Sequence, residues 1–376
     1  MKVTFERDLL AQAVATAMGT VSNKSTIASI EGILLNVSNG KCVMSSFDLE
    51  KGIEITLDAD VEKEGSYIIN AQKLNQIVKA MPKGNITIEV DNRNITKIYS
   101  GKSEFELHAL NGADFPKLPE LSGEIGFGIS QGVLKKMIQQ ITFAIAQNDA
   151  RPALNGAFFK IEANKLTLVS CDGNRLALSE KVCDIDSRGQ NIDSSFIIPG
   201  KTISELMKML DDSDEKIMIT LTRKHIMFSL ENVLFFSRLI DSEYIDYQRF
   251  IPKSNKVVVK VKCSEFIESL ERASLVTEDR SVGQTKSPVK LNFKDSFVNV
   301  SSVSISGKVS DEIEIEKEGD DIEIGFNCRY LLDALRSCDT DDIKILMSTP
   351  LMSMIIEPLE EKEDGKFIFL VLPVKM

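Results

Sequence analysis

The stretch LVSCDGNRLAL, residues 168–178, places a thiol, a carboxylate and a guanidinium around one glycine. A deprotonated cysteine is a nucleophile, provided that a nearby base activates it. Asp172-Gly173 is also a strong tight-turn dipeptide with apolar residues on both sides, which is typical of a β-hairpin. The stretch therefore supports two hypotheses: a catalytic turn with Cys171 as the nucleophile, or the tip of a hairpin.

Other reactive residues are few. The only histidines are His108 and His225, each in a strand-like run, and the six cysteines form no CxxC pair and no zinc-ligand spacing. We therefore expect no metal and no cofactor. The N-terminus, MKVTFERDLL, lacks the apolar region of a signal peptide, so we expect reduced thiols and a cytoplasmic location. The longest apolar run, FIFLVLPV, is too short to span a membrane.

One pattern occurs three times along the 376 residues, at a spacing of roughly 125 to 130 residues. Its second half reads SYIINAQKLNQIVKAMPKGNITIEV, SFIIPGKTISELMKMLDDSDEKIMITL and IEIGFNCRYLLDALRSCDTDDIKILM. Each copy predicts a strand, an amphipathic helix and another strand, with Ile69, Ile198 and Phe326 in equivalent places. A fainter first half predicts a strand that leads into a helix and then into alternating strands.

The boundaries follow DFPKLPE and DYQRFIP, which look like copies of one exit segment. We therefore predict an α+β fold of three domains, residues 1–122, 123–253 and 254–376, each with two helices packed on antiparallel sheets. Three copies of a symmetric domain predict a curved array that continues by adding subunits. The alternative is a duplicated scaffold whose copies share no function.

The net charge of −11 argues at first sight against a nucleic-acid partner. The predicted helices, however, carry an excess of basic residues. Lys73, Lys79 and Lys83 share one helix and its turn without an acidic residue, whereas the fifth predicted helix, with three glutamates, breaks the trend. If the helices share one side of the molecule, that side is basic and attracts phosphate.

Six motifs occur in the order DLE, ADFP, RPALNG, CDGNRLA, DYQRFIP and LPVKM. With these motifs the whole chain resembles the bacterial DNA polymerase III beta subunit family, the sliding clamps. The resemblance implies a closed ring of two head-to-tail subunits, six domains in all, with helices around a central hole and sheets outside. Helix width supports a dimer independently: six helices leave a hole of roughly 10 Å and twelve leave roughly 28 Å, while duplex DNA is about 20 Å across.

The resemblance also implies a function. The ring would encircle duplex DNA without sequence specificity and act as a processivity factor with no catalytic activity of its own. The implied partners are double-stranded DNA, a second copy of the chain, the alpha subunit of the replicative polymerase, the clamp-loader complex and other replication and repair proteins with clamp-binding motifs. The chain has no GxxxxGK[ST] loop, so ATP hydrolysis belongs to a separate loader.

In this family the hairpin turn forms one wall of a pocket between the second and third domains, where partners insert a short glutamine-leucine-hydrophobic peptide. Carried over by motif, the pocket comprises Leu154, Cys171, Gly173, Asn174, Arg175, Leu176, Ile245, Arg249, Phe250, Leu351, Ser353, Leu370, Leu372, Pro373 and Val374. This chain departs from many clamps at Cys171 and Asn174, where threonine and histidine are frequent, and at Ile245, where proline is frequent. Leu372 and Val374 replace two methionines.

Two further sets of residues follow from the resemblance. The DNA-facing residues would be Lys24, Lys73, Lys79, Asn148 and Arg151. The dimer interface would pair an edge strand of the first domain with the third domain, through Phe105, Leu107, Leu275 and Val276. Plain solubility explains the first set equally well, and burial in the internal core is the alternative for the second.

Two competing hypotheses stay open at this point. The first is a scaffold that collects peptide motifs without encircling DNA; the mass in solution and loading onto DNA would discriminate. The second is a hydrolase that uses Cys171, Asp172 and a histidine from elsewhere, which requires a thiol of low pKa.

Overall fold

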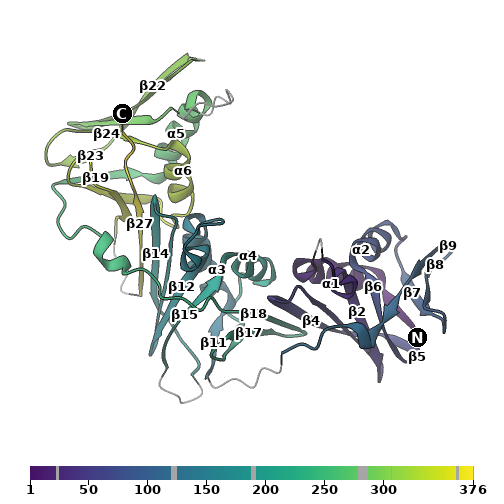
Figure 1. Cartoon of the computed structure of the whole chain (residues 1–376). Helices are drawn as coiled ribbons and strands as arrows, with labels where there is room; N and C mark the ends of the chain where they lie inside the picture. The colour runs from purple at the N-terminus through teal and green to yellow at the C-terminus, as the bar shows by residue number, and fades with distance from the viewer. Residues whose placement is uncertain are drawn as a thin grey trace.

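The structure is a computed structural model that describes residues 1–22, 25–119, 125–187, 192–277, 287–305, 307–360 and 364–375. The chain forms an open arc, with the N-terminal strands at one end and β22 at the other (Figure 1). Along the described residues the α-helices lie on the concave side of the arc and the sheets form its outer side. The helices therefore share one side of the molecule, which is the condition under which the sequence predicts a basic surface.

Each repeat contributes two helices. Their bounds are α1 (Arg7–Ala17), α2 (Ala71–Ala80), α3 (Gln131–Ile141), α4 (Gly200–Met209), α5 (Cys263–Thr277) and α6 (Cys328–Arg336). Polar side chains cap several N-termini: Asn70 accepts from the Lys73 amide, Ser130 from that of Val133, and Asn327 from that of Arg329. Such caps satisfy amides that have no partner inside the helix.

The strands of the first repeat are β1 (Lys2–Glu6), β2 (Gly32–Ser38), β3 (Lys41–Phe47), β4 (Lys51–Asp58), β5 (Asp60–Lys63), β6 (Gly65–Asn70), β7 (Asn85–Val90), β8 (Ile95–Ser100), β9 (Ser103–His108) and β10 (Leu110–Asn111). Those of the second are β11 (Ile125–Ser130), β12 (Gly156–Glu162), β13 (Lys165–Cys171), β14 (Arg175–Val182), β15 (Asp193–Pro199), β16 (Lys216–Leu221), β17 (His225–Leu230) and β18 (Val233–Arg238). Those of the third are β19 (Val257–Lys262), β20 (Val289–Lys294), β21 (Phe297–Ser304), β22 (Gly307–Glu314), β23 (Glu316–Glu318), β24 (Ile322–Phe326), β25 (Asp342–Met347), β26 (Met354–Pro358) and β27 (Gly365–Val371).

Two large antiparallel sheets cross the repeats. One has the order β10-β6-β2-β3-β4-β18-β17-β16-β11 and the other β15-β12-β13-β14-β27-β26-β25-β19-β23. The first repeat is therefore joined to the second by pairing of β4 with β18, and the second to the third by pairing of β14 with β27. Because main-chain hydrogen bonds run across both junctions, the three repeats form one continuous body.

Two smaller sheets lie at the ends of the arc, in the orders β5-β1-β7-β8-β9 and β22-β21-β20-β24. Within the described residues, the outer sides of β9 and β22 have no neighbouring strand. The predicted α+β fold of three repeats, with two helices each on antiparallel sheets, is confirmed. Ile69, Ile198 and Phe326 do occupy equivalent places, paired with Ile33, Ala157 and Val289.

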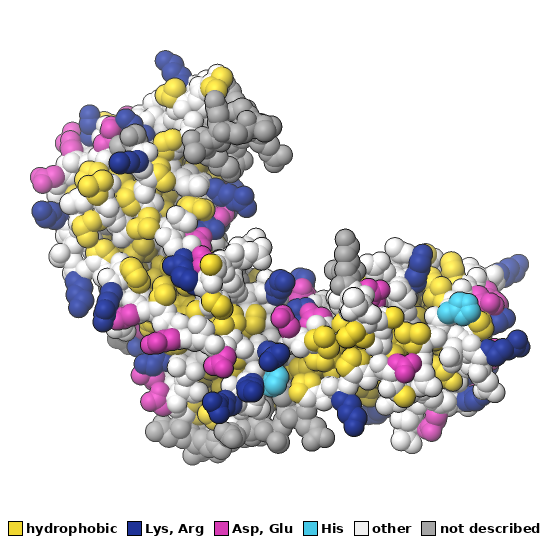
Figure 2. All heavy atoms as spheres, viewed as in Figure 1, with side chains coloured by type: hydrophobic (Ala, Val, Ile, Leu, Met, Phe, Trp, Pro, Cys, Tyr) yellow, Lys and Arg dark blue, Asp and Glu magenta, His cyan; other side chains and the backbone are white. Residues whose placement is uncertain are grey.

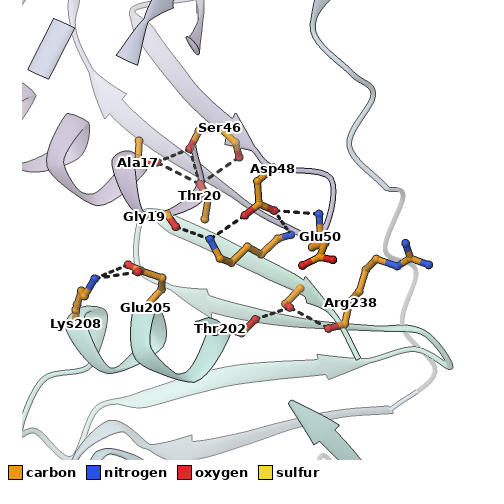
Figure 3. A network of polar contacts seen from close by, with 12 residues as sticks. Ala17, Gly19, Thr20, Ser46, Asp48, Glu50, Thr202, Glu205, Lys208 and Arg238 are labelled. Carbon is orange, nitrogen blue, oxygen red and sulfur yellow. Dashed lines mark hydrogen bonds and ion pairs between the residues drawn. The ribbon is translucent and has the colours of Figure 1, made fainter. Parts of the chain in front are cut away.

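Polar contacts fix the β3–β4 hairpin, whose strand β4 forms the junction with the second repeat (Figure 3). The buried Ser46 hydroxyl donates to the Ala17 carbonyl at the end of α1, at 2.7 Å. Asp48 Oδ1 accepts from the amides of Glu50 and Lys51 at 3.0 and 2.8 Å, which closes the β3–β4 hairpin. These bonds fix the hairpin against the helix that precedes it.

The first prediction concerns the close approach at the start of β12. A Cβ on Gly156 would lie 2.4 Å from the Ile198 carbonyl oxygen, whereas one on Gly126 would have nothing nearer than the Ile219 oxygen at 4.0 Å. We expect Gly156→Ala to lower the free energy of unfolding by about 1 to 3 kcal/mol, because backbone must move. Gly126→Ala is the matched control and should be neutral or slightly stabilising. Urea midpoints measure both, and equal midpoints would contradict the prediction.

Candidate functional site

Residues 171–175 form the tip of a hairpin, so that hypothesis for LVSCDGNRLAL is confirmed. Cys171 on β13 pairs with Leu176 on β14, and the loop between them contains Asp172 to Arg175. Asp172 Oδ1 accepts from the amides of Asn174 and Arg175 at 2.9 and 3.0 Å. Gly173 has φ +89°, a left-handed conformation that glycine adopts without steric cost.

A buried apolar cluster lies beneath this hairpin. It joins the second repeat to the third, and its members are Ala146, Leu154, Val169, Cys171, Leu176, Leu178, Ile355, Ile368 and Leu370. Successive side chains of a strand point to opposite faces, which puts Leu176 and Leu178 of β14 on the face shared with Leu370 of the paired β27. Tyr244 and Ile245, from the segment that leads to the third repeat, pack against the cluster.

Exposed apolar side chains belong to the segments that border this cluster. Leu351 is 85% exposed just before β26, and Phe250 is 56% exposed in the 3-10 turn at Tyr247–Phe250. Leu372 and Val374, in the tail after β27, are 40% and 37% exposed. Figure 2 shows hydrophobic side chains gathered over the face that carries β14 and β27. Exposed apolar patches of this kind are typical of surfaces that bind another molecule.

The C-terminal tail is held beside the hairpin. The Leu372 amide donates to the Asn174 carbonyl at 2.9 Å, and the Val374 amide donates to the Gly325 carbonyl at 2.9 Å. Ser353, at the edge of β26, is 7% exposed. The structure thus brings the predicted pocket residues of the hairpin, β27 and the tail together.

Arg175 occupies the seam between the second and third repeats. Its Nε donates to Asp172 Oδ2 at 3.0 Å and its Nη1 to Asp333 Oδ2 of α6 at 2.7 Å. The guanidinium also lies over the rings of Tyr330 and Phe143, at 4.4 and 5.4 Å from their centroids. With these partners inside the chain, the guanidinium connects the hairpin to α6.

The environment of Cys171 opposes nucleophilic catalysis. Its side chain is buried, its Sγ accepts from the Gly173 amide at 3.4 Å, and burial raises the pKa of the thiol. A nucleophilic cysteine needs the opposite shift. His108 lies on β9 and His225 begins β17, and neither belongs to the cluster around Cys171. These surroundings of Cys171 argue against the hydrolase hypothesis.

The sequence predicts that Arg151 faces DNA. In the structure its guanidinium lies against the hairpin. Its Nη2 is 3.2 Å from the place that a Cβ on Gly173 would occupy. The guanidinium forms an ion pair with Asp149 of the same loop. Its Nε donates to Oδ1 at 2.9 Å and its Nη2 donates to Oδ2 at 3.0 Å. This pair lowers the pKa of Asp149 to about 2. The sequence already indicated that Arg151 lies near the hairpin. The motif RPALNG places it three residues before Leu154, a member of the buried cluster beneath the hairpin.

Three of the remaining predicted DNA-facing residues, Lys73, Lys79 and Asn148, belong to the described part of the chain. Lys73 and Lys79 are exposed on α2, a helix of the concave side. Asn148 is exposed in a left-handed conformation, with φ +59°. It borders a cavity of about 760 Å³ that Asn174 and Arg329 also line. Lys24 lies outside the described residues.

The predicted interface residues lie at the two ends of the arc. Phe105 is 41% exposed on β9 and Leu107 is half-buried beside it. Leu275 is 82% exposed and Val276 is half-buried on α5. Within one chain these two pairs are far apart, so any contact between them requires a second copy.

The described residues contain no group of three or more histidine, cysteine or acidic side chains that is arranged to hold a metal ion. No helix in those residues is long and apolar enough to cross a membrane.

Comparison with known proteins gives the same family along the whole chain. Family models described as the N-terminal, central and C-terminal domains of the DNA polymerase III beta subunit match residues 1–119, 128–246 and 248–375. The chain is 32% identical to the beta sliding clamp of Bacillus subtilis, with 100% of both proteins covered. It is 29% identical to that of Staphylococcus aureus strain N315, covering 100% of this chain and 99% of the relative.

Solved structures agree with these matches. The sliding clamp of Bacillus subtilis superposes with a TM-score of 0.92 at 31% identity, covering 100% of this chain and 99% of that one. A sliding clamp from Pseudomonas aeruginosa, crystallised with griselimycin, gives 0.90 at 26% identity with both chains fully covered. The fold and the matches define a DNA sliding clamp. The chain belongs to the DNA polymerase III beta subunit family, and its place is in DNA replication.

The second prediction tests the state of the Cys171 thiol. Alkylation proceeds through the thiolate, so a raised pKa should make Cys171 react more slowly at pH 7 than an unperturbed cysteine, whose pKa is about 8.5. We expect the rate to keep rising above pH 8.5. Peptide mass mapping after timed iodoacetamide treatment measures this rate, with the urea-unfolded chain as the control. A midpoint below pH 7 in the folded protein would restore the nucleophile hypothesis.

Proposed function

We propose that two copies of this chain close head to tail into a ring that encircles duplex DNA without sequence specificity. The observation that carries the proposal is the arc itself. Its helices line the concave side, and among the described residues the strand at each end, β9 or β22, has one edge without a neighbouring strand. An exposed edge strand is a template for pairing with another chain, and a second copy supplies the complementary edge.

Electrostatics support DNA as the molecule in the hole. The helices α2 and α3 each carry two lysines and no acidic residue, although the whole chain carries a net charge of −11. Lys73 and Lys79 are exposed on α2, which lies on the concave side. Diffuse contacts between lysines and phosphates carry no sequence information, which suits a ring that slides.

The apolar patch at the junction of the second and third repeats is proposed as the peptide-binding site. Leu351, Leu372 and Val374 offer exposed apolar surface next to a rigid hairpin. Cys171, Asn174 and Ile245 lie at the same junction, as the family's motif implies. Through this site the ring would tether the alpha subunit of the replicative polymerase, the clamp loader and other replication and repair proteins.

Three further proposals complete the assignment. The repeats divide at 1–122, 123–253 and 254–376, in line with the residues that the three family models match. The chain acts as a processivity subunit and catalyses no reaction itself. Its location is the cytoplasm, at the nucleoid.

The third prediction tests the peptide site. Leu351→Asp should weaken the binding of a glutamine-leucine-type peptide at least tenfold, because one buried leucine contributes about 1.5 to 3 kcal/mol. Val182→Asp is the matched control, since Val182 is also an exposed apolar residue, 52% exposed at the end of β14. Fluorescence polarisation measures both affinities. Equal affinities for the two variants would place the peptide elsewhere.

The fourth prediction tests the ring on DNA. Light scattering should give about twice 41.8 kDa for the unmodified protein and for Val182→Asp, but a monomer for Leu275→Asp, because a charge would be buried at the interface. After loading by a clamp loader with ATP, the dimers should stay on nicked circular DNA in high salt and leave when the circle is cut.

Equal release from intact and cut circles would exclude a topological link. A dimer that binds peptide but is never retained on circles would favour the scaffold hypothesis.

A further inference from the structure

A basic cluster lies beside the junction of the second and third repeats. It consists of Arg223 and Lys224 in the turn between β16 and β17, and Arg238 at the end of β18. We propose that this cluster binds acidic residues that flank the apolar motif of a partner peptide. The inference rests on the proposed peptide-binding site and adds to it a charged contact that selects among partners.

The three cations of the basic cluster lie close together. His225 at the start of β17 pairs with Arg238 of β18, and Lys224 directly precedes His225. Burial and the nearby charges of Arg238 and Lys224 lower the pKa of His225. Figure 2 shows Lys and Arg side chains gathered near β17 and β18, on the same face as the hydrophobic patch. Positive charge is thus concentrated at one place in a chain whose net charge is −11.

These cations have no partner inside the described part of the chain. All three side chains are exposed, and no ion pair or hydrogen bond among the described residues involves their guanidinium or ammonium groups. Figure 3 shows the Arg238 side chain extending away from the polar contacts of the β3–β4 hairpin. Cations without an internal partner are free to bind an anionic group from another molecule.

The backbone holds the basic cluster in a fixed arrangement. Thr222 Oγ1 accepts from the amides of Lys224 and His225 at 3.3 and 2.9 Å, which orders the turn. The Leu239 amide donates to the Lys224 carbonyl at 2.8 Å, which ties the turn to the chain that follows β18. Because the backbone is already ordered, an incoming peptide has to order only side chains, and less affinity is lost.

The basic cluster borders a cavity that continues toward the proposed peptide site. The cavity has a volume of about 480 Å³, and Arg223, Lys224 and Arg238 line it together with Phe158 and Tyr244. The rings of Phe158 and Tyr244 stack with centroids 5.2 Å apart, and both residues pack against the apolar cluster beneath the hairpin. The cavity and the peptide site therefore share a wall, and one extended peptide can contact both.

Two carboxylates line the same cavity. Asp241 and Glu243 belong to the segment that leads to the third repeat, and both are exposed. Three cations against two carboxylates leave an excess of one positive charge. The turn from Thr222 to Lys224 contains no acidic residue, so we expect the acidic residues of a peptide to bind at the turn.

A peptide fits this surface better than a nucleic acid does. The strands β17 and β18 belong to a sheet of the outer side, away from the helices of the concave side. Toward the hairpin the cavity wall is aromatic, through Phe158 and Tyr244, and its cations come from the turn and the end of β18. Acidic residues next to an apolar motif match this order, whereas a phosphate backbone gains most from cations along its whole length.

Three labelled forms of a glutamine-leucine-type peptide test the contact. One is the motif alone, one has a four-residue extension that contains Glu and Asp, and one has the same extension with the isosteric Gln and Asn. Each extension, which reaches at most about 13 Å, is made at either end of the motif. In low salt the acidic form should bind about three- to tenfold more tightly than the uncharged form from one of the ends, and high salt should remove the difference. Fluorescence polarisation measures these affinities.

Two matched variants locate the contact. Arg223→Gln combined with Lys224→Gln should abolish the advantage of the acidic form and leave the binding of the motif alone unchanged. Lys41→Gln combined with Lys63→Gln removes the same charge from exposed lysines of the first repeat and should keep the advantage. The inference is overturned by equal affinities of the acidic and uncharged forms at both ends, by an advantage that survives in full without Arg223 and Lys224, or by an equal loss in the control.

Two further outcomes separate this inference from its alternatives. If the motif alone does not bind the unmodified protein, the proposed peptide site itself is overturned, and the inference with it. A labelled single-stranded oligothymidine provides the comparison with nucleic acid. Binding of this oligonucleotide that is lost without Arg223 and Lys224 but kept in the control, together with no advantage of the acidic peptide, would assign the basic cluster to nucleic acid instead.

Discussion

The structure depends on one constraint: the edge of a β-sheet must be paired, covered or made unattractive to other chains. This chain builds three similar units, each of which presents one strand to its neighbour and receives one from the other side. Inside the chain two of these contacts are closed, through β4 with β18 and β14 with β27. The third contact cannot close within one chain, because its two strands lie at opposite ends of the arc (Figure 1). The need for a second copy follows from this geometry.

The same pairing gives the binding surface its rigidity. The hairpin tip at Asp172 is fixed by its own carboxylate, by strand pairing on both sides and by the ion pair of Arg175 with Asp333. A rigid surface suits the proposed binding of flexible peptides, because less affinity is lost when the groups of the surface are already ordered. The equivalent hairpin at Asp48 has the same carboxylate-to-amide bonds, but Phe47 and Phe236 fill the space beside it, with centroids 5.6 Å apart. The junction between the first and second repeats is thus filled by its own aromatic side chains. The junction between the second and third repeats keeps apolar side chains exposed along its border.

Charge is distributed according to the same division. The helices α2 and α3 of the concave side contain lysines and no acidic residue, while the excess of negative charge lies elsewhere on the chain. The exception noted in the sequence, the acidic helix α5, is the helix nearest the end of the arc. Its glutamates form ion pairs within the third repeat, among them Glu271 with Arg336 at 2.7 Å. These local ion pairs account for part of the acidic character of α5, which departs from the basic character of the other helices.

The sequence by itself determined the units: the threefold pattern, the two helices of each unit and the turn at Asp172-Gly173 are local features, set by hydrophobic period and by residues that favour turns and caps. It could not decide which side chains meet across a junction, because those contacts join residues far apart in the chain. Arg151 shows the difference. Its motif suggested a residue facing DNA, and only the packed hairpin placed its guanidinium beside Gly173. Arg175 shows it again, since a turn residue became the link to α6 once β14 and β27 had paired. Secondary structure follows from local chemistry, whereas partners across a junction are decided when distant strands come into register.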